Sequence, residues 1–256
     1  MRLNQTFSLK NKILAQIAFC PLPFAFCLLL GCAKQDPILP GTRESVFDNN
    51  EVVVLNEALP SSFDQGPLAL SPCPYRQDNN NVVWDGDKKI FSGFATDNFV
   101  AGVRTPACNG DFVYAGLSTG ELVKVNAKTR YVAWVADIYR ESNMTGGAGM
   151  TDIVASAQIA DKAVYAGGLG DAFCKIKDSN GKKIWCLNIG VQYNFILTDN
   201  AAFVVATDGN LYGIDTASGA AYWRSAVKKQ IAPILKDDVI VVGREKFDPR
   251  TGTKIK

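Results

Sequence analysis

The sequence contains no histidine in 256 residues. This absence excludes the Ser-His-Asp and Cys-His forms of nucleophilic catalysis, and it excludes zinc sites built on imidazole ligands. It leaves carboxylate, lysine, cysteine and cofactor chemistry as the routes open to an enzyme.

The chain also lacks an excess of positive charge. The formal net charge is +2, from 27 basic and 25 acidic residues. Three of the basic residues lie within residues 1–31, which contain no acid, so the remainder has 24 basic and 25 acidic residues. A protein that binds nucleic acid needs a basic surface for the phosphates, and we therefore exclude nucleic acid as the main partner.

Residues 1–31 read as an export signal. Three cations precede an almost wholly apolar run at 13–30, and Pro21 and Pro23 interrupt that run. A cleaved leader tolerates such interruption better than a permanent spanning helix does. The run ends Leu29-Leu30-Gly31-Cys32.

This ending resembles the bacterial lipobox, and the resemblance implies that Cys32 is lipidated and becomes the mature N-terminus. Ala33 follows, with no aspartate to retain the protein in the inner membrane. The expected location is the periplasmic face of the outer membrane. The alternative is an ordinary secretory signal in which Cys32 is incidental.

Export leaves four cysteines beyond Cys32 in an oxidising compartment. Cys174 and Cys186 flank a predicted turn at 178–181, which would place them nearly opposite each other on paired strands. A Cys174–Cys186 disulfide leaves Cys73–Cys108 as the second by elimination. Four free, partly buried thiols are the alternative.

Residues 32–80 are rich in proline and glycine and are predicted to form a tether. Their one strand-like run is Glu51–Leu55, which is expected either to pair with the last repeat or to lie as an isolated edge.

An internal repeat occupies residues 81–256, and its most regular copy is Asn200–Trp223. Apolar and aromatic residues recur at fixed distances before three tryptophans, Trp134, Trp185 and Trp223. The columns hold Tyr114, Tyr165 and Phe203 at −20, Leu122, Phe173 and Leu211 at −12, and Val125, Ile176 and Ile214 at −9. Gly181 and Gly219 stand at −4, where the first copy has Arg130. Repeats of this length with one tryptophan each predict an all-β fold, a β-propeller of about four blades.

The two ends of the repeat region are irregular. Asn81–Trp84 is predicted to be the closing strand of an incomplete unit. A last unit begins at Val239–Val242, and setting Gly252 at −4 puts Phe247 at −9 and Lys256 in the tryptophan column. About five residues are then missing between its strands. We expect the tryptophans to be structural wedges between blades, and turn acids such as Asp208 and Asp215 to be caps.

The repeat pattern resembles the PQQ-like repeat, which occurs in quinoprotein dehydrogenases and in the BamB family of outer-membrane assembly lipoproteins. The dehydrogenases are much longer and use a carboxylate cluster, a stacking tryptophan and often an adjacent-cysteine disulfide. This chain has no adjacent cysteines, and its four tryptophans lie in or close to the structural column, so none is free to stack on a cofactor. We therefore expect no PQQ, no metal and no catalytic residue.

The BamB resemblance rests on the lipobox, the tether and the cofactor-free repeats, and on Asp36–Phe47, which is similar to the segment after the anchor in alphaproteobacterial members. It implies a scaffold that docks a POTRA domain of the BamA insertase. Two segments are similar to the family's docking loops, Asn98–Arg104 and Gly149–Val154. Arg104 and Asp152 are the expected partner-binding residues, although Val154 stands where the family often has a second acid.

Three functions compete at this stage. The first is the assembly scaffold, the second is a lipid-anchored binding module for a peptide or glycan, and the third is a quinoprotein enzyme. Family members close eight blades, whereas this sequence offers about four. A small closed ring, a dimeric ring and a shortened gene product are all consistent with the repeats.

Overall fold

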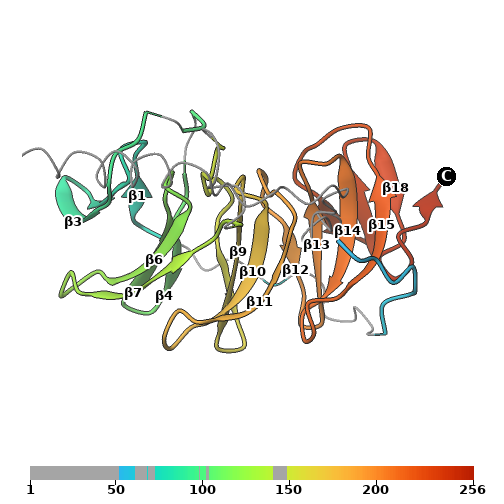
Figure 1. Cartoon of the computed structure of the whole chain (residues 1–256), viewed down its shortest axis with the longest axis horizontal. Helices are drawn as coiled ribbons and strands as arrows, with labels where there is room; N and C mark the ends of the chain where they lie inside the picture. Colours follow the sequence, from blue (N-terminus) through green and yellow to red (C-terminus); the bar gives the residue numbers. More distant parts are fainter. Residues whose placement is uncertain (1–51, 61–67, 69–72, 98, 102–103, 141–148) are drawn as a thin grey trace, which may run out of the picture. The chain divides into compact units, whose positions relative to one another are not determined.

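The computed structural model describes residues 52–60, 68, 73–97, 99–101, 104–140 and 149–256. In this part of the chain every regular element is a β-strand (Figure 1). None of the described residues forms a helix long and apolar enough to cross a membrane. The leader, Cys32 and Asp36–Phe47 lie outside the described residues.

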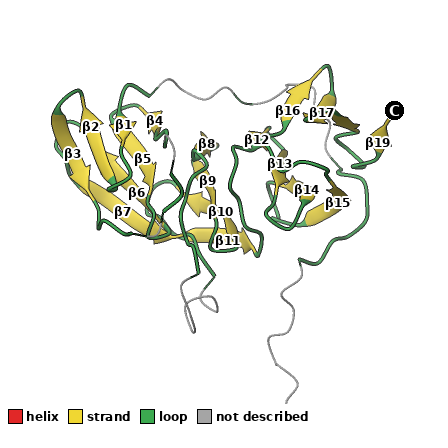
Figure 2. Ribbon diagram, turned by 90° about the horizontal axis from the view of Figure 1, so that it is seen from above, coloured by secondary structure: helices red, strands yellow, loops and turns green. Residues whose placement is uncertain are grey.

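The strands form five antiparallel sheets, each made of strands that are consecutive in the chain (Figure 2). The N-terminal sheet contains β1 (Arg76–Gln77), β2 (Val82–Asp85) and β3 (Lys88–Ser92). Blade 1 contains β4 (Ala107–Asn109), β5 (Phe112–Gly116), β6 (Glu121–Asn126) and β7 (Val132–Asp137). Blade 2 contains β8 (Gln158–Ala160), β9 (Ala163–Gly168), β10 (Ala172–Lys177) and β11 (Lys183–Leu187).

Blade 3 contains β12 (Ile196–Leu197), β13 (Ala201–Val205), β14 (Asn210–Asp215) and β15 (Ala221–Ala226). Blade 4 contains β16 (Ile234–Lys236), β17 (Val239–Val242), β18 (Glu245–Phe247) and β19 (Lys254–Ile255). Four-stranded antiparallel meanders of this kind are the blades of a β-propeller. The predicted all-β propeller architecture is confirmed, with four blades and an additional three-stranded sheet.

The spacing of the repeat follows from strand register. In blade 2, Tyr165 pairs with Lys175, which pairs with Trp185, so the −20 and 0 columns lie in one row across the sheet. A register shift falls directly after this row in blades 1, 2 and 3 alike. The first and last residues of one cross-strand row are therefore twenty residues apart in the chain, which gives the repeat its interval.

The core consists of apolar clusters, each between consecutive sheets. Alternate residues of a strand enter different clusters because successive side chains point to opposite faces. In β9, Val164 packs with blade 1, whereas Tyr165 packs with blade 3. Both faces of an inner blade are thus buried, which explains why its strands are apolar at successive positions.

Each tryptophan of the repeat docks on the turn glycine of the following blade. A Cβ atom on Gly181 would lie 2.9 Å from the Trp134 ring, and one on Gly219 would lie 2.6 Å from the Trp185 ring. Both glycines have positive φ, at 72° and 77°. The Trp134 indole nitrogen also donates to the Asp178 carbonyl oxygen at 2.8 Å. The predicted wedges are therefore present, and the −4 glycine is required by close approach as well as by backbone conformation.

The first copy of the repeat has Arg130 at −4 in place of glycine. Arg130 adopts the same turn conformation, with φ at 60°, and its side chain is exposed. The tryptophan of the preceding sheet, Trp84, differs from the other three. Its indole nitrogen donates to Asp78 of its own sheet at 2.9 Å, whereas the other three donate to a carbonyl of the next blade.

Trp84 itself corrects one expectation. It was predicted to lie in a closing strand, but β2 is the middle strand of the N-terminal sheet, and β3 closes that sheet. The expected start of the propeller at residue 81 falls in the connection between β1 and β2.

Blade 4 is shorter than blade 3 by the amount that the repeat alignment predicted. Ala202 pairs with Ile214 in blade 3, and Ile240 pairs with Phe247 in the matching row of blade 4. The second pair spans five residues fewer. The turn after Val242 accounts for the difference, because it joins two shortened strands directly.

Residues 52–59, which we call the strap, lie along blades 3 and 4. Val54 forms a parallel bridge with Ala221 of β15, and the Leu55 amide donates to the Ala221 carbonyl. Leu59 is fully buried, and its amide donates to the Arg250 carbonyl in blade 4. The expectation that this run pairs with the last repeat or lies as an isolated edge is thus corrected. Val54 bridges to blade 3, and Leu59, beyond the run, bonds to the last blade.

Turn acids act as caps, as predicted. Asp208 accepts a hydrogen bond from the Asn210 amide at 3.0 Å, and Asp215 accepts one from the Ser218 amide at 2.7 Å. Asp208 also accepts the Tyr212 hydroxyl proton at 2.6 Å. Burial of the phenol and this bond together raise the pKa of Tyr212 to about 12.

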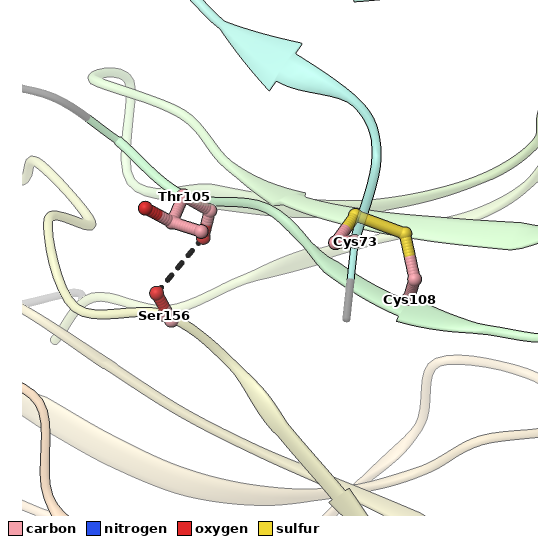
Figure 3. Close-up of a disulfide and its surroundings, with 4 residues drawn as sticks. All are labelled: Cys73, Thr105, Cys108 and Ser156. Atoms are coloured by element: carbon pink, nitrogen blue, oxygen red, sulfur yellow. Dashed lines mark hydrogen bonds between the residues drawn. A yellow bond between two sulfur atoms is a disulfide. The ribbon is translucent and has the colours of Figure 1, made fainter. Parts of the chain in front are cut away.

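Two disulfides are present in the structure. Cys174 and Cys186 are cross-strand partners in β10 and β11. Cys73 precedes β1 and is bonded to Cys108 of β4, so this disulfide joins the start of the N-terminal sheet to blade 1 (Figure 3).

We expect the Cys73–Cys108 disulfide to contribute more stability than Cys174–Cys186. Their cysteines are separated by 35 and 12 residues. In the chain-entropy treatment, closing the longer loop stabilises by about 4 kcal/mol and closing the shorter by about 3 kcal/mol. Urea unfolding of the two paired serine variants, C73S/C108S and C174S/C186S, measures both losses. Equal midpoints for the variants and the wild type, or a thiol titration that finds four free thiols, would contradict this expectation.

Candidate functional site

The segments that join successive sheets gather over the hairpin turns of the blades. Connector 1 is residues 93–106, connector 2 is 138–157, connector 3 is 188–195, and connector 4 is 227–233. Backbone bonds hold them to the turns between second and third strands: Ile153 donates to Leu117, and Val191 donates to Gly168. We call the surface formed by these connectors and turns the connector face.

Both predicted docking segments belong to the connector face. Asn98–Arg104 lies in connector 1, and Gly149–Val154 ends connector 2. Residues 98, 102 and 103 lie outside the described residues, as do 141–148 of connector 2. The two segments meet through one pair of side chains, Arg104 and Asp152.

Arg104 and Asp152 form a buried ion pair. The distance between Arg104 Nη2 and Asp152 Oδ2 is 2.5 Å, and the two side chains are 3% and 0% exposed. The same carboxylate oxygen accepts the Val100 amide at 2.7 Å. The Arg104 guanidinium also lies 5.9 Å from the centre of the Phe99 ring. One carboxylate thus fixes two points of connector 1.

The rest of this polar group is incompletely hydrogen bonded among the described residues. Arg104 Nε and Nη1, Asp152 Oδ1 and Gln77 Oε1 are buried without a partner there. Gln77 is bridged to Arg104 through the backbone and donates its side-chain amide to the Gly116 carbonyl at 2.6 Å. A buried charge with unused donors depends strongly on its single counterion.

Packing also holds connector 2 in place. A Cβ on Gly116 would lie 2.3 Å from the Ile153 side chain, so β5 passes directly under this residue. The Asp152 carbonyl accepts the Leu169 amide at 2.9 Å, and Ile153 is 1% exposed. Asp152 is therefore positioned between blades 1 and 2, with its side chain directed to connector 1.

This arrangement changes the role that the two residues can have. Because both charges are buried against each other, neither is presented to a partner as a free charge. The pair instead sets the positions of the backbone on either side of it. The surface available for contact is made by the exposed neighbours on connectors 1 and 2.

Sequence reasoning missed a second polar group in the same region. Asn81 is fully buried, and its side chain donates to the Phe94 carbonyl at 2.6 Å and to Ser118 Oγ at 2.7 Å. The Ser118 amide donates back to Asn81 Oδ1 at 2.9 Å. Asn81 was read as the beginning of a strand, and no local pattern signals a contact with a residue 37 positions later.

Neighbouring connectors are also joined just before the inner strands of the blades. Ser156 donates its hydroxyl to the Thr105 carbonyl at 2.9 Å (Figure 3), and Gln158 donates to the Phe195 carbonyl at 2.5 Å. The first contact links the ends of connectors 1 and 2, and the second links β8 to the end of connector 3, so neither belongs to a reactive cluster. In the described ranges no three His, Cys, Asp or Glu side chains are placed to hold a metal ion.

The fold and the connector face together define a propeller of PQQ-like blades whose irregular features lie between the blades. The family model described as "Outer membrane protein assembly factor BamB" matches residues 71–225 and again 175–253. This chain belongs to that family.

Individual relatives are distant. Over 147 residues the chain is 22% identical to the outer membrane protein assembly factor BamB of Moranella endobia (strain PCIT), which covers 56% of this chain and 38% of that protein. The crystal structure of BamB from Moraxella catarrhalis is similar over 73% of this chain and 59% of its own, with 17% identity and a TM-score of 0.51. The chain thus spans less than two thirds of the length of each of these relatives.

A quinohemoprotein alcohol dehydrogenase, ADHIIG from Pseudomonas putida HK5, is similar over 71% of this chain and 40% of its own, with 13% identity and a TM-score of 0.49. That likeness is too weak to bear on function. The BamB likeness confirms the predicted fold.

Proposed function

We propose that this chain is a non-enzymatic scaffold lipoprotein of outer-membrane β-barrel assembly. It is held at the periplasmic face of the outer membrane by lipid on Cys32. It docks a POTRA domain of a BamA-type insertase through the connector face, by recognition without chemistry.

One observation carries the docking part of this proposal. The two segments that are similar to the family's docking loops belong to different connectors, 48 residues apart at Arg104 and Asp152, and the ion pair brings them together. A scaffold needs a preorganised surface, because ordering loops on binding costs free energy. The buried pair supplies that order before a partner arrives. Membership of the BamB family supports the same role.

Site-specific crosslinking in cells tests the partner. A photoreactive residue at Met150, which is 44% exposed on connector 2, is expected to capture the BamA-type insertase. The matched control is the same residue at Ile184, which is 53% exposed on β11 and outside the connector face. It is expected to give little or no insertase adduct.

Lipidation is tested in the same cells. A Cys32→Ser chain lacks the sulfur that would carry the lipid, so it is expected in the soluble periplasmic fraction with a much weaker adduct. Recovery of only unrelated envelope proteins at Met150 would favour the anchored binding module and overturn the scaffold role. Membrane retention of the serine variant would overturn the anchor.

A further inference from the structure

Among the large apolar side chains of the described residues, Phe94 is the most exposed, at 82%. It lies on connector 1, two residues after β3. An isolated exposed phenylalanine is unremarkable when its backbone is mobile. Here the backbone is held on both sides, because Gly93 donates its amide to the Asn81 carbonyl and Phe94 accepts from the Asn81 side chain.

Met150 of connector 2 directly precedes a residue that bonds to the turn between β5 and β6. Its neighbour Thr151 donates its hydroxyl to the Ser118 carbonyl at 3.3 Å, and Ser118 also contacts Asn81 and Thr96. Connectors 1 and 2 therefore meet over the turn that begins at Ser118. Met150 directly precedes Thr151, and Phe94 lies two residues before Thr96. Both exposed side chains are therefore close in sequence to a residue that bonds to this turn.

The charged side chains around this turn are mostly acidic. Asp97 is exposed on connector 1, and Glu121 and Asp137 are cross-strand partners at the end of β6 and β7 nearest the turn. Within residues 93–122 the one basic residue is Arg104, which is buried in its ion pair. Arg140 of connector 2, three residues after Asp137, is the other basic residue near the turn, and it is half-buried. Connector 4, by contrast, carries exposed Lys228 and Lys229.

We propose that Phe94 and Met150 form the apolar centre of a docking patch with an acidic rim of Asp97, Glu121 and Asp137, and that its occupant is an apolar side chain flanked by lysine or arginine. This inference rests on the proposed function and names the chemistry of the insertase surface that the connector face accepts. Rigid aromatic anchors at the centre of an interface carry most of its affinity, and charges at the rim mainly raise the association rate.

The test measures binding of the purified periplasmic domains of the BamA-type insertase to the purified full chain. Phe94→Ala is expected to raise the dissociation constant by about 30-fold or more, as for a central hot spot. Met150→Ala is expected to raise it by roughly 3- to 10-fold. The matched control is Ile184→Ala, an equally simple truncation outside the connector face, which should bind like the wild type.

The acidic rim is tested separately, through the association rate. Asp97→Asn/Asp137→Asn is expected to slow association at low salt, and the difference from the wild type should vanish at high salt because the charges are exposed. Thermal melting confirms that each variant stays folded. If the wild-type chain binds and Phe94→Ala binds equally well, the docking patch is overturned while the proposed partner stands. Absence of binding by the wild-type chain overturns the proposed partner and, with it, the patch.

Discussion

Replacement of Asp152 by alanine is expected to lower the free energy of unfolding by about 3–5 kcal/mol, because it leaves a buried guanidinium without a counterion. Arg104 is 3% exposed and makes its one ion pair in the described chain with Asp152. The Val100 amide loses its acceptor in the same variant. Urea unfolding, with midpoint and slope fitted separately, measures the loss.

The control removes both charges together. An Arg104→Met/Asp152→Leu chain has no uncompensated charge, and the methionine and leucine occupy similar apolar volume. Replacing a whole buried pair in this way is often neutral or stabilising. We therefore expect the double variant to unfold at a higher urea concentration than Asp152→Ala. If the single and double variants are equally unstable, the pair acts through packing rather than through charge.

The same double variant separates the global stability of the chain from the ordering of connector 1. Without Asp152, the Val100 amide has no partner among the described residues, so its hydrogen exchange is expected to accelerate even if global stability is preserved. Under the proposed function, a faster-exchanging connector 1 should also bind the insertase domains more weakly. Equal exchange at Val100 in both chains would argue against a positioning role for Asp152.

The repeat and its wedges could be predicted because their signals are local. Tyr165, Lys175 and Trp185 share one row, and that row imposes a fixed spacing that is visible along the sequence. The strands nearest the connectors could not be predicted in the same way. β12 consists of Ile196 and Leu197 alone, and two residues do not establish a period of two.

The candidate site depends on contacts between residues far apart in the chain. Arg104 and Asp152 were selected through resemblance to a family, and no pattern in the sequence indicates that they pair with each other. Their burial was equally hidden, since charged residues are rarely buried unless paired. Asn81 shows the same limit, because its partners Phe94 and Ser118 lie in the next connector and the next blade.

Replacement of Trp134 by alanine is expected to cost about 3–5 kcal/mol, the range for removing a large buried aromatic side chain. The ring is 7% exposed and fills the space against Gly181 of the next blade. Its indole nitrogen donates to the Asp178 carbonyl, which also accepts Lys124 Nζ at 3.0 Å. Removal therefore opens a cavity between blades 1 and 2 and removes one of the two hydrogen bonds to the Asp178 carbonyl.

Trp84→Ala is the matched control, since it deletes the same side chain from a different setting. Trp84 is partly exposed between Arg76 and Lys89, and its indole nitrogen bonds within its own sheet. Exposed positions lose less on truncation, so we expect a cost of no more than about 2 kcal/mol. Urea unfolding of both variants measures the difference. Equal losses would show that the docking of a tryptophan on the next blade's turn is not what holds consecutive blades together.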